Sequence, residues 1–162
     1  MKKITLLATL ALAATSSAFA DNYFGGSIGS GATIHYQTDL SAASAVRYGL
    51  NLSFVGLSSN GLTLGGGVDY LNDVSTGGQS FGGLSPYYGF GLDAGVGLGS
   101  ITSIVLYPHV LGGLSYNVTA PLSVFGEVNA GPAIGFATAG GSSSTGVSFG
   151  YGARIGLNYR LP

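Results

Sequence analysis

The chain has 162 residues, of which only 7% are charged, and its formal net charge is −1. An average soluble domain is about 25% charged, so this composition is not that of an ordinary soluble protein. The absence of cysteine excludes disulfides and cysteine-ligated metals, and the lack of a basic patch argues against nucleic-acid binding.

The first 20 residues have the organisation of a secretory signal peptide. Residues 2–3 are lysines, residues 4–14 form an apolar run, and Ala18-Phe19-Ala20 matches a cleavage site. The apolar run is too short to cross a bilayer as a helix, which needs about 20 residues. We therefore expect export through the secretion translocon and cleavage after Ala20, which leaves residues 21–162 as the mature chain.

The mature chain is poor in charge and rich in glycine. It contains no lysine, all 30 glycines and nine charged side chains, of which six are acidic and three are arginines. No stretch of it is apolar for long enough to form a membrane-spanning helix. Because every backbone polar group in lipid needs a partner within the protein, a closed β-barrel would be the only way for it to span a membrane.

Apolar and polar residues alternate along the mature chain, which is the period of a strand with one apolar face. The alternation is clearest at the C-terminus, where apolar residues occupy every odd position from Val147 to Leu161. Turn-forming residues separate the segments, such as Asn60-Gly61, a strong hairpin signal, and the polar run of residues 140–144. The predicted strands cover residues 23–37, 44–56, 62–71, 84–98, 103–116, 122–136 and 147–161.

These seven segments are an odd number, whereas bacterial transmembrane barrels have an even number of strands. The first segment divides most easily at Gly29-Ser30-Gly31, which gives eight strands. The expected fold is therefore all-β, an antiparallel up-and-down transmembrane β-barrel of eight strands formed by residues 21–162 as one domain.

Alternation alone does not decide which face of the strands meets lipid. A polar face in water should be about 25–35% charged, whereas here it consists mainly of Gly, Ser, Thr and Asn. This composition suits a narrow barrel interior and directs the apolar face outward, although a soluble β-sandwich is the alternative. Aromatic residues near the ends of the predicted strands suit interfacial girdles: Tyr48, Tyr70, Tyr116, Phe136 and Tyr159.

The last predicted strand carries a short motif. It reads polar-x-Gly-x-x-hydrophobic-x-hydrophobic, with Arg154, Gly156, Tyr159 and Leu161 at the defining positions. With the signal peptide and the alternating strands, the motif makes the whole mature chain resemble the small, roughly eight-stranded bacterial outer-membrane β-barrel family. The resemblance implies insertion into outer-membrane lipid and recognition of the last strand by the outer-membrane assembly machinery. The chain departs from the family pattern by ending on Leu161 and Pro162 rather than on an aromatic residue.

Charged residues of the polar face are expected to point into the barrel, where they must pair or be hydrated. Folding about the Asn60 turn places Arg47 diagonally near Asp69, and folding about residue 141 places Glu127 near Arg154. The cluster is interpreted either as an ion-pair plug or as the selectivity groups of a small channel. Its expected members are Arg47, Asp69, Asp93, Glu127, Arg154 and Arg160.

The sequence offers little for catalysis or cofactor binding. His35 and His109 do not match the His-x-Ser pair of lipid A acyl hydrolases with a similar fold, and two distant histidines do not make a zinc site. We expect both to be hydrogen-bonded interior residues, and we assign no catalytic, cofactor or metal residue. The leading expectation is a structural or surface-interaction barrel without chemistry. A narrow pore for very small solutes and a lipid-modifying enzyme are the alternatives.

Overall fold

The computed structural model describes residues 21–53, 62–74, 82–98, 102–139 and 142–162. The predicted signal peptide (residues 1–20) and the predicted Asn60-Gly61 turn lie outside the described residues. No helix in these described ranges is long and apolar enough to cross a membrane.

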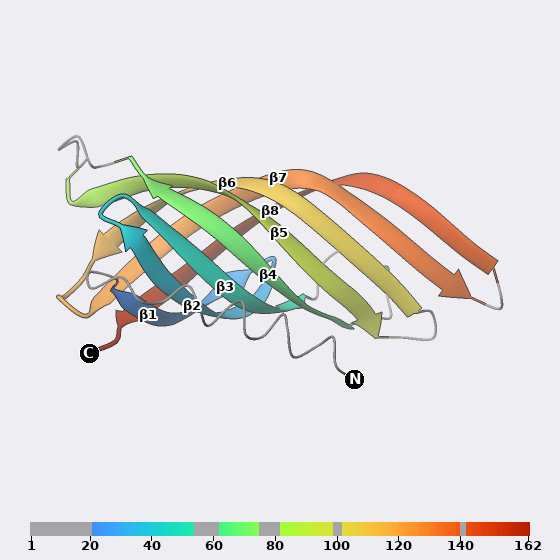
Figure 1. Cartoon of the computed structure of the whole chain (residues 1–162), viewed down its shortest axis with the longest axis horizontal. Helices are drawn as coiled ribbons and strands as arrows, with labels where there is room; N and C mark the ends of the chain where they lie inside the picture. The colour runs from blue at the N-terminus through green and yellow to red at the C-terminus, as the bar shows by residue number, and fades with distance from the viewer. Residues whose placement is uncertain (1–20, 54–61, 75–81, 99–101, 140–141) are drawn as a thin grey trace.

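The described residues form eight antiparallel strands that close into a barrel (Figure 1). Each strand pairs with its neighbours in chain order, and β1 pairs with β8 to complete the ring. The fold class predicted from the alternation is therefore confirmed. The strands are β1 (Asn22–Gly29), β2 (Gly31–Ser41), β3 (Ser44–Ser53), β4 (Leu62–Asp73), β5 (Leu84–Leu98), β6 (Thr102–Asn117), β7 (Leu122–Ala139) and β8 (Ser142–Arg160).

The predicted division of the first segment is confirmed, because β1 ends at Gly29 and β2 begins at Gly31. The predicted loop over residues 140–144 is too long, since β7 continues to Ala139 and β8 already begins at Ser142. Residues 142–146 are serine, threonine and glycine and show no apolar alternation. Their strand conformation comes from pairing with β7, in which Ala139 pairs with Ser142. Pairing with a second strand cannot be predicted from the alternation of residues within one strand.

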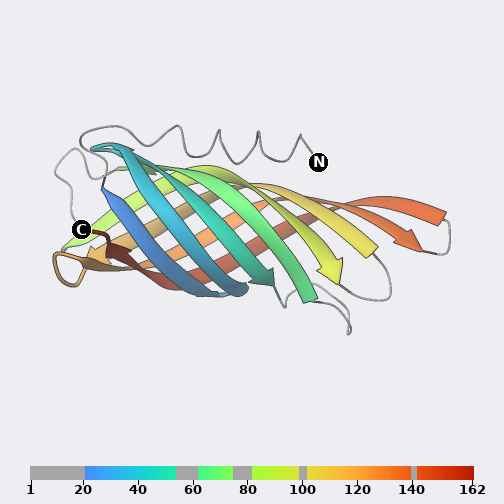
Figure 2. The same cartoon turned by 60° about the horizontal axis from the view of Figure 1, so that its bottom comes forward.

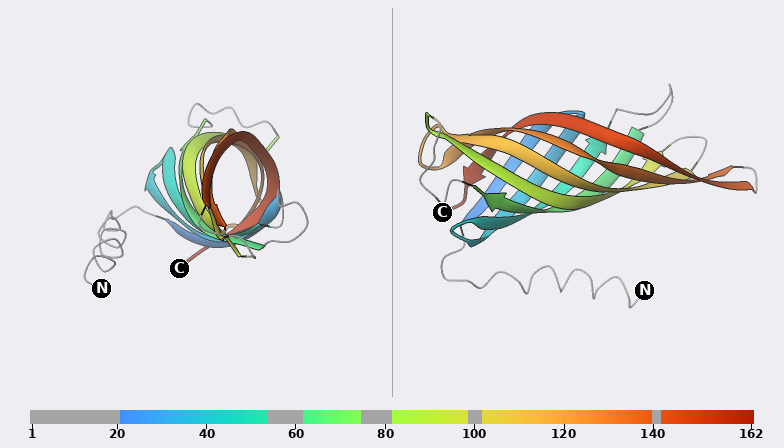
Figure 3. Two further views of the ribbon diagram at one scale, coloured as in Figure 1. Left: turned by 90° about the vertical axis from the view of Figure 1, so that its right-hand side faces the viewer. Right: turned by 90° about the horizontal axis from the view of Figure 1, so that it is seen from above.

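The barrel wall is much higher on one side than on the other. Strand length rises from 8 residues in β1 to 19 in β8. One end of the barrel, here called the level end, carries the start of β1 and the C-terminus, where the Leu161 amide donates to the Asn22 carbonyl. At the opposite end, the projecting end, β7 and β8 extend beyond the other strands (Figures 2 and 3). The barrel rim is therefore slanted.

Side chains alternate between the two faces of the wall, and the outward ones are the apolar set. Phe149 and Tyr151 on β8 are 72% and 84% exposed, whereas Arg47 and Glu127 are buried inside the barrel. Among the described residues, the buried hydrophobic side chains are few: Ala45, Leu71, Leu111 and Phe125. The predicted orientation, polar inside and apolar outside, is confirmed, and the distribution is the reverse of that in a soluble protein.

Inward glycines make room for the large inward side chains. A Cβ at Gly156 would lie 2.5 Å from the Phe125 ring, and a Cβ at Gly150 would lie 2.9 Å from the Tyr107 ring. Such distances are below van der Waals contact, so each aromatic ring lies directly over a glycine backbone. The glycines of the polar face therefore let the interior fill with rings and polar groups.

The β6–β7 ladder is interrupted at one place. Registered pairs end with Leu106 and Ile134 and resume with Val110 and Ala130. This register places Pro108 opposite Pro132, and neither proline has an N–H to donate. The ladder therefore lacks registered pairs at three consecutive positions of β6, from Tyr107 to His109, and resumes at the Val110–Ala130 pair.

Candidate functional site

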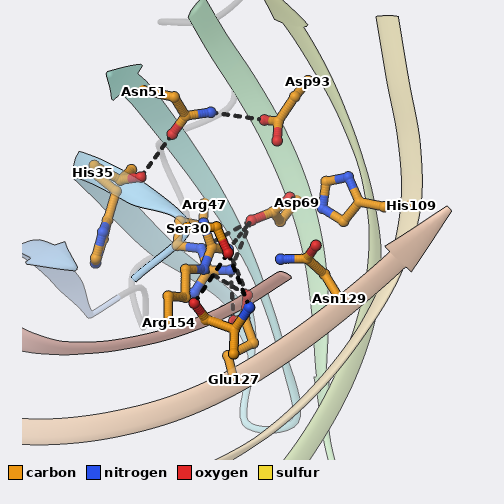
Figure 4. A network of polar contacts seen from close by, with 12 residues as sticks. Ser30, His35, Arg47, Asn51, Asp69, Asp93, His109, Glu127, Asn129 and Arg154 are labelled. Carbon is orange, nitrogen blue, oxygen red and sulfur yellow. Dashed lines mark hydrogen bonds and ion pairs between the residues drawn. The ribbon is translucent and has the colours of Figure 1, made fainter. Parts of the chain in front are cut away.

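Four charged side chains meet inside the barrel and form a closed ring of ion pairs (Figure 4). Arg47 on β3 donates from Nη2 to Asp69 Oδ2 on β4 over 2.7 Å and to Glu127 Oε2 on β7 over 2.8 Å. Arg154 on β8 donates from Nε to Glu127 Oε1 over 2.7 Å and from Nη2 to Asp69 Oδ2 over 3.1 Å. Each arginine thus contacts both carboxylates, and the two positive charges balance the two negative ones.

Two further side chains complete the bonding of the two carboxylates. The Tyr87 hydroxyl on β5 donates to Glu127 Oε2 over 3.0 Å. His109 Nε2 on β6 lies 3.2 Å from Asp69 Oδ1. The Glu127 side chain is 0% exposed, so its charge depends entirely on these protein partners. Removal of one partner would leave a charge that water does not reach.

The Phe125 side chain packs against the four-residue charge cluster from one side. The Arg47 guanidinium carbon lies 5.6 Å from the centre of the Phe125 ring, within cation–π distance. Phe125 also packs edge-on against His35. This stacking limits the positions open to the arginine fork and so fixes its two carboxylate contacts.

The sequence prediction found the pairs of this ring but not its closure. Arg47 and Asp69 are directly opposite rather than diagonal, and Glu127 is directly opposite Arg154, as expected for neighbouring strands. The contacts from Arg47 to Glu127 and from Arg154 to Asp69 cross the lumen and were not predicted. Tyr87 was also missed, although its odd position on β5 places it on the same inward face as Asp93.

Two of the six predicted interior charges lie outside the ring. Asp93 accepts a hydrogen bond from Asn51 Nδ2 over 3.0 Å, nearer the projecting end. Arg160 pairs with Asp21 at the level end, and its side chain is 49% exposed. The placement of Arg160 in the interior cluster was wrong, because the last residue of β8 lies where the barrel opens to its surroundings.

Both histidines are buried and hydrogen-bonded, as predicted. His35 Nε2 on β2 lies 2.6 Å from Asn158 Oδ1 on β8, and the contact passes over Gly25 of β1. His109 Nδ1 lies 3.1 Å from the Tyr107 carbonyl oxygen, while its other nitrogen faces Asp69. The hydrogen bonds of these two rings are therefore made to amide, carbonyl and carboxylate oxygens rather than to a serine hydroxyl. In the part of the chain that the structure describes, no group of histidine and carboxylate ligands could hold a metal ion.

A polar cavity of about 230 Å³ lies between the charge ring and the level end. Its walls carry hydroxyl and amide groups, for example those of Ser85, Ser115, Ser123 and Asn158. Arg47 and Tyr87 are also among its lining residues, so the cavity extends to the ring and meets it from one side. Between the level end and the charge ring, the interior therefore forms a polar vestibule that ends at a layer of paired charges.

Comparison with known proteins identifies the fold. No protein-family model matches the chain, and no curated protein sequence matches it. The structure is similar to the N-terminal β-barrel domain of Pseudomonas aeruginosa OprF, with a TM-score of 0.54 and 11% identity over 88% of this chain and 96% of that domain. It is also similar to Acinetobacter baumannii CarO2, with a TM-score of 0.53 and 10% identity over 88% of this chain and 98% of that one. The chain has the fold of small outer-membrane β-barrel proteins.

Proposed function

We propose that this chain is an integral outer-membrane β-barrel with a structural or surface-interaction role, whose lumen is closed by the ring of Arg47, Asp69, Glu127 and Arg154. The observation that carries the proposal is the ring itself, which joins β3, β4, β7 and β8 across the lumen through ion pairs of 2.7–3.1 Å. An eight-stranded barrel is just wide enough for its side chains to fill it. An ion entering from the vestibule would have to break paired, buried charges.

The proposed location rests on the outward apolar face and on the fold. Outer-membrane barrels carry an outward-facing apolar band about 25 Å tall, and the exposed apolar side chains of β8 from Val147 to Tyr159 match such a band. The chain would reach the outer membrane through the secretion translocon, after cleavage of residues 1–20. Membrane fractionation with N-terminal sequencing tests both steps, and the expected N-terminus is Asp21. A chain recovered from the periplasm without detergent would refute the proposed location.

Planar-bilayer recording separates a closed barrel from the alternative, a narrow pore for very small solutes. The closed barrel should give no stable conductance, whereas Arg154→Gln, which opens the ring, should give small cation-favouring openings. Arg160→Gln is the matched control, because it removes an arginine that lies outside the ring. Stable conductance in the unmodified protein, with an ion preference that depends on Arg154, would favour the pore instead.

The proposed function includes no catalytic step. Among the described residues, the buried histidines are hydrogen-bonded to Asn158, Asp69 and the Tyr107 carbonyl rather than to a serine hydroxyl. The lipid-modifying enzyme is therefore the weaker alternative. Incubation of the refolded barrel with radiolabelled outer-membrane lipid, followed by chromatography, should show no released acyl chain. Acyl release that is lost in His109→Gln but kept in His35→Gln would contradict the proposal.

We further propose that the last strand is read by the outer-membrane assembly machinery. Tyr159 and Leu161 point outward at the level end, where such a protein could reach them. Arg154 and Gly156 are used inside, since Arg154 belongs to the ring and Gly156 underlies Phe125. Changing both Tyr159 and Leu161 to serine should leave protease-sensitive, unassembled chain in cells, while the same variant should still refold in vitro. Normal assembly of that variant would reduce the motif to coincidence.

A further inference from the structure

An apolar hollow lies on the outward face of the barrel, across β6, β7 and β8. Its volume is about 610 Å³. Three small lining residues, Gly112, Ala130 and Ala153, are here called its floor. The other lining residues include Val110, Val128 and Tyr151, together with the polar residues Ser30 and Asn129. The hollow adjoins the Val110–Ala130 rung, which is the first rung after the break between Pro108 and Pro132. It contains no charged side chain.

The hollow borders a gap in the barrel wall. β1 pairs with β8 only from Arg154 to Arg160, so in the described residues no strand pairs with the other edge of β8 from Ser142 to Gly152. We call this the open edge. Ser30, in the β1–β2 turn, terminates the paired part: its amide donates to the Ala153 carbonyl over 3.1 Å, and its hydroxyl accepts from the Ala153 amide over 3.1 Å.

The direction of the backbone groups along the open edge follows from these bonds. In an antiparallel ladder, every second residue directs both N–H and C=O to the same neighbour. Ala153 and Leu161 direct theirs towards the β1 side, so the other odd residues of β8 do the same. Tyr151 and Phe149 therefore point their N–H and C=O groups at the open edge. Their side chains face outward and are 84% and 72% exposed.

The height of the wall places this edge in lipid. A tilted strand needs about 9–11 residues to span a bilayer, whereas β1 has 8. The turn at Ser30 would therefore end below the far surface of the apolar band, while the apolar outward residues of β8 continue past it to Val147. Backbone groups in hydrocarbon need a partner. A molecule bound here must therefore place an apolar part in the hollow and polar atoms beside the backbone groups of the open edge.

We propose that the hollow binds one acyl chain of a membrane lipid, whose ester and glycerol groups lie at the open edge beside Tyr151 and Phe149. A phospholipid meets both requirements, since an uncharged chain suits the uncharged floor and ester oxygens accept from backbone N–H groups. The hollow is also continuous with the outward apolar surface that a bilayer covers. This inference rests on the membrane location proposed above.

The test is lipid retention after refolding into dimyristoylphosphatidylcholine vesicles and extraction with mild detergent, with native mass spectrometry to count bound lipid. One lipid should remain on the unmodified barrel. Ala130→Leu, which fills the floor, should lose it. Ala94→Leu should keep it, because Ala94 is an exposed outward alanine on β5, away from the hollow. Ala153→Leu is a second filling variant and should behave like Ala130→Leu.

Heat-modifiability of every variant separates failure of this inference from failure of the proposed function. A barrel that inserts and shows the heat-dependent gel shift, but retains no lipid, would overturn the lipid site and leave the membrane location intact. Equal retention in Ala130→Leu and Ala94→Leu would overturn it as well. A chain that stays soluble and never inserts into the vesicles would overturn both proposals.

Discussion

The two faces of this barrel wall are built on opposite principles, although they alternate residue by residue along the same strands. The inner face is held by a few specific contacts, because each buried charge has named partners at 2.7–3.2 Å. The outer face of the described strands consists mainly of apolar side chains that are exposed to the surroundings, such as Val128, Phe149 and Tyr151. A substitution inside should therefore act through the loss of a particular contact, and a substitution outside through its compatibility with lipid.

The largest effect is expected inside, at Glu127. Glu127→Gln leaves two arginines and one carboxylate in a buried ring, and the free energy of unfolding should fall by about 3–5 kcal/mol. Urea unfolding in lipid vesicles measures it. The double variant Glu127→Gln with Arg154→Gln keeps the ring neutral, so it should lose less than the sum of the single variants. Strict additivity would mean that the two side chains do not interact.

The next effect tests the outer face on the same strand. Val128→Arg places a charge in the apolar band and should lower the free energy of unfolding by roughly 2–4 kcal/mol near the bilayer midplane. The inward control, Ser123→Thr, should change it little. Vesicle unfolding of both variants gives the comparison. If Val128→Arg were tolerated as well as the control, the assignment of the two faces would be reversed.

A smaller difference in stability is expected between glycine-to-alanine substitutions on the inner and the outer face. Gly156 is inward, and a Cβ there would meet the Phe125 ring and the Gly26 carbonyl oxygen at 2.5 Å. Gly156→Ala should therefore cost about 1–3 kcal/mol through overpacking. Gly126 faces outward with nothing within 4 Å of an added Cβ, so Gly126→Ala should be neutral or slightly stabilising. Chemical unfolding of the Gly156→Ala and Gly126→Ala variants measures the two effects. Equal losses of unfolding free energy would argue against the packing of the Phe125 ring over Gly156.

The smallest effect compares two arginines of β8. Arg160 pairs with Asp21 at the exposed level end, so Arg160→Gln should cost less than about 1 kcal/mol, and the cost should shrink further in high salt. Arg154→Gln should cost several times more and respond weakly to salt, because its partners are buried. Unfolding at low and high sodium chloride measures both. A salt-sensitive Arg154→Gln would indicate that water reaches the ring.

The inside–outside assignment could be predicted because it depends on parity within one strand. The pairs Arg47–Asp69 and Glu127–Arg154 could be predicted because each lies within a single hairpin. The contacts across the lumen could not be predicted, because they depend on how the barrel closes and how its strands tilt. Neither property follows from the sequence of a single hairpin. Arg160 was misplaced for a related reason: parity gives a direction but not the depth at which the barrel ends.

Because the rim is slanted, its two sides can be used to measure the orientation and the depth of the barrel in the membrane. β8 has 19 residues and β1 has 8, so their projecting ends differ by roughly 35 Å at about 3.3 Å per residue along the strand direction. An epitope tag inserted next to Ala139 would stand well clear of the bilayer, whereas the same tag at Ser30 would begin at the depth of the acyl chains. Antibody access to the two tags on whole cells would therefore report both the orientation of the barrel and the depth of its shorter side.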